Sequence, residues 1–163
     1  FLKVGVIADE HGLESLAVSN RVRAPGIVVR RSAYERAGGY RTDLPHAADW
    51  EMWTRLAALG PVVFVDEVLA AYRRHAASDT SGRVRTGENV RERVRAIGVV
   101  LAHVPESRRR ALGRRALAYA VVFAARTALR LLRAGELGPA ARQGREALRC
   151  LLLVVRGQVP TSG

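Results

Sequence analysis

The chain has 163 residues, of which 48% are hydrophobic and 26% are charged, with a formal net charge of +12. This length fits one domain of ordinary size, and the hydrophobic content excludes a disordered chain. The first 80 residues contain ten basic and ten acidic side chains, whereas residues 81–163 contain 17 basic and five acidic ones. The whole positive excess therefore lies in the second half, and we divide the chain into two domains, 1–80 and 81–163.

Residues 1–80 are predicted to mix strands and helices. Strands are expected at 27–29, 62–65 and 68–72, where β-branched residues cluster next to turn residues. Residues 1–7 fit either a short strand or the start of a buried helix. Helices are expected at 13–18, at 33–37 and at 47–59, the last because Trp50, Trp53 and Leu56 recur at helical spacing. Gly60 and Pro61 then end this helix.

Residues 81–163 are predicted to be helical after a small polar linker at 78–82. In the first helix, apolar residues recur at intervals of four and three until Pro105 ends the pattern: Val90, Val94, Ile97, Leu101 and Val104. A second helix is expected over 107–133, and a third begins at Pro139 after a glycine-containing turn. The apolar residues of the third helix are Ala140, Gly144, Ala147, Leu148, Leu151, Leu152 and Val155.

Several widespread catalytic and metal-binding patterns are absent from the sequence. It contains no CxxC, HExxH, GxSxG, GxxxxGK[ST] or GxGxxG motif, and its four histidines lack metal-ligand spacing. The single cysteine, Cys150, excludes an internal disulfide and favours a reducing compartment such as the cytosol. No apolar stretch approaches the roughly 20 residues of a membrane-spanning helix, so we expect a soluble or peripheral protein.

Asp49 is the most interesting carboxylate because it lies at the start of a predicted helix. The exposed N–H groups and the dipole of a helix start stabilise an ionised carboxylate, which can accept a proton from an incoming hydroxyl. The alternative interpretation is that Asp49 is simply the N-cap of this helix.

Four segments between residues 30 and 75 have a characteristic order: RRSAYE at 30–35, AGGYRTDLP at 37–45, AADWEMWTRLA at 47–57 and GPVVFVDEVLAAYRRH at 60–75. Their order and spacing resemble the carboxyl-terminal half of the catalytic domain of family 2 glycosyltransferases, which have the GT-A fold. The resemblance covers about residues 24–78. It implies an α/β fold class, with a partial GT-A-like mixed sheet and helices, followed by an all-α helical extension.

The resemblance also implies roles for individual residues. Asp49 would be the general base of an inverting sugar transfer in bacterial cell-surface polysaccharide synthesis. The sugar and acceptor would contact Gly38, Gly39, Tyr40, Trp50, Trp53 and Arg55. Arg73 or His75 would approach the diphosphate or a metal ion. Ala48 departs from the family pattern, which usually has a second acidic residue there.

Structural interpretations of the same residues remain open. Trp50 and Trp53 lie three apart and also fit a helical core. Arg73 also fits an ion pair with Asp66 or Glu67, and His75 an exposed strand end.

The implied partners are a nucleotide sugar and a glycan or lipid-linked acceptor, and the implied cofactor is a divalent metal, Mg or Mn. In the family, an amino-terminal half with an Asp-x-Asp motif holds the metal and the donor. The present chain contains no Asp-x-Asp, begins at Phe1 and has Met52 as its only methionine. We therefore expect a piece of a longer cytoplasmic enzyme that is inactive as these 163 residues alone.

The arginine-rich second half has three interpretations. Nucleic-acid binding is disfavoured, because the only aromatic residues there, Tyr119 and Phe123, lie in an apolar run away from the arginines. A non-enzymatic adaptor would bind an anionic membrane surface or a protein partner through helices that combine arginine and leucine, peripherally at the inner face of the plasma membrane. The third interpretation is a helical bundle whose arginines are only solvated.

Overall fold

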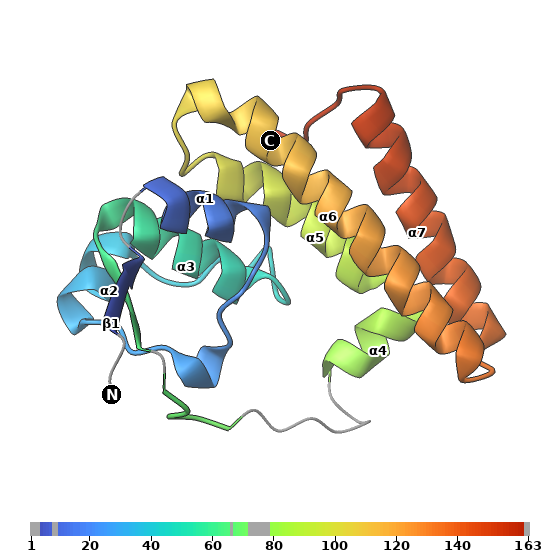
Figure 1. Ribbon diagram of the computed structural model, residues 1–163, viewed down its shortest axis with the longest axis horizontal. Helices are drawn as coiled ribbons and strands as arrows, with labels where there is room; N and C mark the ends of the chain where they lie inside the picture. The colour runs from blue at the N-terminus through green and yellow to red at the C-terminus, as the bar shows by residue number, and fades with distance from the viewer. Residues whose placement is uncertain (1–3, 8–9, 66, 72–78, 162–163) are drawn as a thin grey trace.

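The fold is dominated by helices (Figure 1). The computed structural model describes residues 4–7, 10–65, 67–71 and 79–161. Its elements in chain order are β1 (Val4–Ile7), α1 (Glu10–Val18), the short 3-10 helix η1 (Ala24–Gly26), α2 (Arg31–Ala37), α3 (Ala48–Leu59), β2 (Val62–Val65), α4 (Asp79–Thr86), α5 (Glu88–Leu101), α6 (Glu106–Arg133) and α7 (Leu137–Val155). Helices α5, α6 and α7 pack into one bundle, against which α1 and α3 lie (Figure 1).

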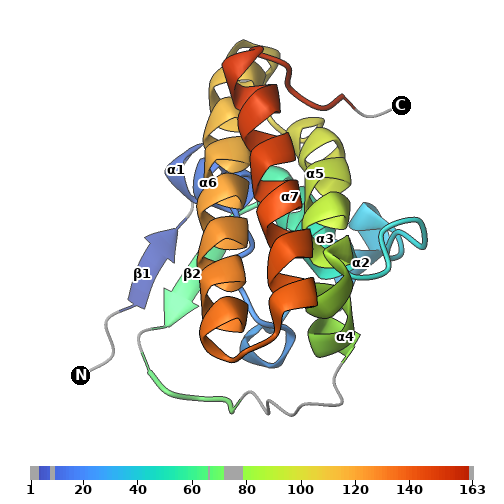
Figure 2. The ribbon, with the colours of Figure 1, turned by 90° about the vertical axis from the view of Figure 1, so that its right-hand side faces the viewer.

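The three long helices of the second half confirm the sequence prediction, with boundaries within a few residues. Gly87, at a φ of +80°, precedes α5, and Pro105 precedes α6. Gly135, at a φ of +75°, forms the turn that reverses the chain between α6 and α7. These two helices run side by side along most of their length (Figures 1 and 2). The expected polar linker at 78–82 is wrong in part, because helix α4 begins at Asp79.

The hydrophobic core is built from both sides of position 80. Its main cluster joins Ala17, Leu44 and Trp50 to residues of α5 and α6, among them Ile97 and Leu117. A second cluster of small residues lies between α5, α6 and α7 and consists of Val90, Ala120, Ala124 and Cys150. Helices that meet through small side chains can approach closely, which explains the dense contact of α6 with α7.

Among the described residues, sheet structure is limited to one antiparallel pair. Strand β1 pairs with β2, with Val4 opposite Val65 and Ile7 opposite Val62. The strand expected at 27–29 is absent, and Val28 is 99% exposed, so no neighbouring strand or helix covers it. Residues 68–71 also lack regular structure, and Tyr72 lies outside the described residues.

The expected α/β fold class is therefore wrong. A GT-A-like mixed sheet needs parallel strands joined by crossover connections, and two short antiparallel strands cannot form one. The helices that cover a GT-A sheet would here have no sheet to cover, since α1 and α3 pack on other helices. The assignment to family 2 glycosyltransferases is wrong for the same reason, because the described fold does not match a fragment of the GT-A domain.

Candidate functional site

Asp49 is the second residue of α3, and Ala47 holds the N-cap position. The interpretation of Asp49 as the N-cap is thus wrong. One carboxylate oxygen of Asp49 accepts a hydrogen bond from the backbone N–H of Trp50 at 2.6 Å. The start of α3 is capped from another helix, because Glu92 of α5 accepts hydrogen bonds from the backbone N–H groups of His46 and Ala47. The sequence pattern missed this cap, since the two partners are 45 residues apart.

The structure brings five of the predicted binding residues close together beside α3. The guanidinium of Arg55 donates to the carbonyls of Ala37 and Gly39. Gly38 lies between them at a φ of +82°, and a Cβ atom there would be 3.7 Å from Nη1 of Arg55. The ring of Tyr40 meets Trp53 edge-on, with 6.1 Å between the ring centroids. Because Arg55 is occupied by backbone carbonyls, its visible role is to hold the 37–39 loop against α3.

Two further observations concern the aromatic residues of this group. Burial, then the neighbouring Tyr34 and more weakly Asp49, raise the pKa of Tyr40 to about 12, so its hydroxyl stays protonated at neutral pH. Trp50 points into the core, and its Nε1 donates to the carbonyl of Leu16 at 2.6 Å. Arg73 and His75 lie outside the described residues. The binding and catalytic roles of the whole group stay predictions that no finding tests.

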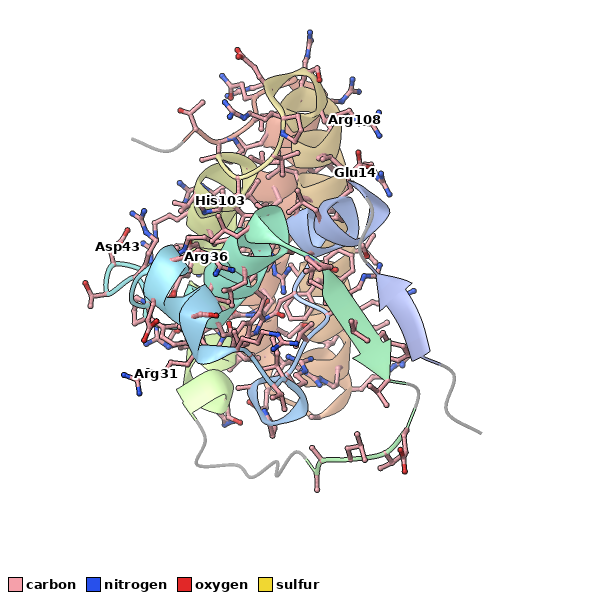
Figure 3. The ribbon with its side chains drawn as sticks, turned by 90° about the vertical axis from the view of Figure 1, so that its left-hand side faces the viewer. Glu14, Arg31, Arg36, Asp43, His103 and Arg108 are labelled. Carbon is pink, nitrogen blue, oxygen red and sulfur yellow. The ribbon has the colours of Figure 1, made fainter. Side chains whose placement is uncertain are left out.

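A buried polar cluster joins α3 to α5 and was not foreseen. Glu51 is 1% exposed and holds both Arg55, four residues later, and His103, just beyond α5, at 2.9 and 2.8 Å. Burial alone would raise the pKa of Glu51, but the hydrogen bonds and charges of His103 and Arg55 outweigh it and lower the pKa below the ordinary value. His103 faces the α3 side of the molecule (Figure 3). Glu51, Arg55 and His103 thus form a buried polar network that connects α3 to the end of α5.

Arg93 is a largely desolvated cation that forms no ion pair with the described residues. Its guanidinium carbon lies 5.2 Å from the ring centroid of Trp50, 5.4 Å from Tyr119 and 4.9 Å from Phe123. The atom Nη1 is buried without a hydrogen-bond partner among the described residues. Burial lowers the pKa of Arg93, although nearby groups including Asp49 act in the opposite direction. Three aromatic faces therefore replace the carboxylate that a buried arginine ordinarily pairs with.

The outward face of α7 carries an exposed apolar stripe. Its large residues are between 44% and 75% exposed and lie on one flank of the helix, beside the buried Ala140, Gln143 and Cys150; they are Leu137, Leu148, Leu151, Leu152 and Val155. Four arginines line one edge of this stripe at helical spacing: Arg142, Arg145, Arg149 and Arg156. Figure 2 shows α7 in front of its neighbours, with no described element over this face.

The neighbouring helix α6 adds further exposed apolar and basic residues. Tyr119, Val122, Leu129 and Leu132 are 40% to 53% exposed, and exposed arginines lie between them on the same helix. Near the start of α6, Arg108 pairs with Glu14 of α1 at 2.8 Å and so connects the two halves of the chain (Figure 3). We call the exposed leucines, valines and arginines of α6 and α7 the hairpin surface.

Within the described ranges, no group of three His, Cys, Asp or Glu side chains is placed to hold a metal ion. In the same ranges, no helix combines the length and apolar character needed to cross a bilayer. The expected divalent metal, nucleotide sugar and acceptor thus stay untested.

The comparisons with other proteins leave the class of this protein open. No protein family and no solved structure matches the chain. A segment of 69 residues is 36% identical to "Uncharacterized protein MT1568" of Mycobacterium tuberculosis (strain CDC 1551 / Oshkosh). The match covers 42% of this chain and only 22% of the relative's length, so it aligns a part of this chain with about a fifth of that protein.

Proposed function

We propose that residues 81–163 form a non-enzymatic basic helical module that binds an anionic membrane surface. The observation that carries this proposal is the apolar stripe of α7, which is exposed on one flank of the helix, between the buried residues and a row of arginines. Leucines in such a stripe can enter the boundary between headgroups and acyl chains, while arginines at its edge contact lipid phosphates. The excess of 17 basic over five acidic residues in this half suits the negative inner face of the plasma membrane.

The energetics favour binding through the combined surface. Each arginine near an anionic membrane contributes about 1 kcal/mol, and a leucine that loses part of its contact with water contributes a similar amount. Several of each together suffice for reversible peripheral binding without a membrane-spanning helix. Sugar transfer was implied only by the family resemblance, and we do not carry it further.

Co-sedimentation with vesicles tests the proposal directly. The chain should pellet with vesicles that contain phosphatidylglycerol, remain in solution with pure phosphatidylcholine, and lose binding as salt is raised. The double variant Leu148→Gln, Leu152→Gln should bind roughly tenfold more weakly, because two leucines no longer enter the lipid. Equal binding to both kinds of vesicle, or to the variant and the wild type, would refute the proposal.

The matched control is Val28→Gln, Val68→Gln, which removes two apolar side chains that are 99% and 95% exposed but lie outside the hairpin surface. This variant should bind vesicles as the wild type does. If the leucine variant instead changes the sedimentation coefficient of the free chain, the stripe is an interface between copies, and membrane binding through it is excluded.

A further inference from the structure

A hollow of about 280 Å³ lies along one face of α6. It is lined by six residues from one face of this helix: Tyr119, Val122, Phe123, Arg126, Thr127 and Arg130. Its volume is near the lower end of the range of small-molecule sites, roughly 300–1,000 Å³. The lining combines two aromatic rings and a valine with two guanidinium groups, so it offers an apolar wall and a cationic end.

The two arginines of the hollow are available for a ligand. Arg126 and Arg130 are exposed, and neither forms an ion pair or a hydrogen bond with the described part of the chain. They are one helical turn apart on the same face, which brings their side chains within reach of one anionic group. Thr127 donates its hydroxyl proton to the carbonyl of Phe123 at 2.8 Å, so the donors for an anion must come from the arginines.

Arg93 adds a third cation next to the hollow. Its guanidinium lies against the rings of Tyr119 and Phe123, and both rings line the hollow. No carboxylate of the described residues forms an ion pair with Arg93, although Asp49 attracts its charge from a longer distance. A positive potential in a partly desolvated place attracts anions more strongly than exposed arginines alone do.

We infer that this hollow binds a phosphate ester with an apolar or aromatic group. The phosphate would accept hydrogen bonds from Arg126 and Arg130, whose planar guanidinium groups match its oxygens. The apolar group would lie on Tyr119, Val122 and Phe123. Either a lipid headgroup or a soluble phosphate ester supplies this chemistry. The site lies on α6, apart from the α7 stripe, and rests on the proposed membrane binding only if the phosphate belongs to a lipid.

A titration with phenyl phosphate, followed by amide chemical shifts or calorimetry, tests the site. Phenyl phosphate should bind more tightly than inorganic phosphate, because only the former has a ring to stack on the aromatic wall. The double variant Arg126→Gln, Arg130→Gln should weaken this binding by about tenfold or more. No binding of phenyl phosphate, equal binding of inorganic phosphate, or unchanged binding in the variant would each overturn the inference.

The control is Arg145→Gln, Arg149→Gln on α7, which removes the same charge at the same spacing from two exposed arginines outside the hollow. This variant should keep its affinity for phenyl phosphate while its binding to anionic vesicles falls. Monomeric dihexanoyl phosphatidic acid separates the two sources: binding tighter than that of phenyl phosphate indicates a lipid, and weaker binding a soluble ester. Because phenyl phosphate needs no membrane, the site can fail or succeed independently of vesicle binding.

Discussion

At the scale of single residues, Arg93 shows how an arginine can be held in an interior without a carboxylate. Its guanidinium lies among the rings of Trp50, Tyr119 and Phe123, and the aromatic faces stabilise its charge only in part. The desolvation of a charge without a hydrogen-bonded partner costs several kcal/mol, so the apolar contacts of the side chain must supply the stabilisation. The charge of Arg93 should therefore destabilise the fold, whereas the volume of its side chain should stabilise it.

We predict that Arg93→Met leaves the free energy of unfolding unchanged or raises it by about 1 kcal/mol, since methionine keeps the contacts and removes the charge. Arg93→Ala should lower it by about 2–3 kcal/mol, because the aromatic cage is left with a cavity. Urea unfolding of both variants measures the difference. If Arg93→Met lowers the free energy of unfolding as much as Arg93→Ala does, the charge itself stabilises the fold.

Glu51 predicts a pH dependence of stability. Its pKa in the folded chain is below the ordinary value of 4.5, so the ionised form favours folding above that pH, and this contribution is lost as the pH falls through the folded pKa. Glu51→Gln should lower the free energy of unfolding by about 2 kcal/mol at neutral pH. In urea titrations at several pH values, the difference from the wild type should narrow below pH 4.5.

The control for this prediction is Glu35→Gln. Glu35 also pairs with an arginine four residues away, Arg31, but its side chain is 61% exposed. An exposed pair of this kind contributes only a few tenths of a kcal/mol. If Glu35→Gln lowers the free energy of unfolding as much as Glu51→Gln does, burial does not strengthen the interactions of Glu51.

At the scale of elements, the sequence predicted where the long helices lie in the chain, but not which face of each helix is buried. Intervals of three and four mark an amphipathic helix wherever it lies, and Gly135 and Pro105 mark its ends. The same intervals do not say which face meets the neighbour. In α7 the buried residues are Ala140, Gln143 and Cys150, and Leu153 and Val154 pack partly against the core. Leu148, Leu151 and Leu152 stay exposed. Ala140 and Cys150 are small, and Cys150 shares a core cluster with alanines of α6, which lets the two helices approach closely there.

Gly113 tests whether the packing around α6 requires a residue without a side chain at this position. A Cβ atom at Gly113 of α6 would lie 2.3 Å from Cγ1 of Val159 and 3.0 Å from Cδ1 of Leu101. Gly113→Ala should therefore lower the free energy of unfolding by about 1 kcal/mol, although alanine is the better helix former. Gly144→Ala on α7, where nothing lies within 4 Å, should raise it by roughly 0.5–1 kcal/mol. Thermal unfolding compares the two, and equal gains would show that Val159 moves aside freely.

At the scale of the whole molecule, the failed prediction concerns the first half. The β-branched run at 27–29 and the residues at 68–71 have the composition of strands, but strand formation needs a partner strand, which a local pattern does not specify. Helix α3 was predicted from its own spacing and did form. What the sequence could not indicate is that α3 packs on α5, through Glu51 with His103 and through the cap from Glu92. Contacts between residues this far apart leave no periodic signal.

These contacts bear on the division of the chain at position 80. Trp50 belongs to a core cluster that also contains Ile97, Val100 and Leu117 from the second half. Removal of residues 1–80 would expose that part of the cluster, together with the buried carboxylate of Glu92. Segments that share a core and buried polar contacts unfold together as one cooperative unit.

The two tryptophans allow this to be measured, because Trp50 and Trp53 are the only ones in the chain and both lie in α3. Tryptophan fluorescence therefore reports on the first half, whereas far-ultraviolet circular dichroism is dominated by the long helices α5, α6 and α7. We predict that the two signals change together in urea, with the same midpoint and slope. If fluorescence changes at clearly lower urea than circular dichroism, residues 1–80 and 81–163 are independent domains, and the α3–α5 contacts contribute little to stability.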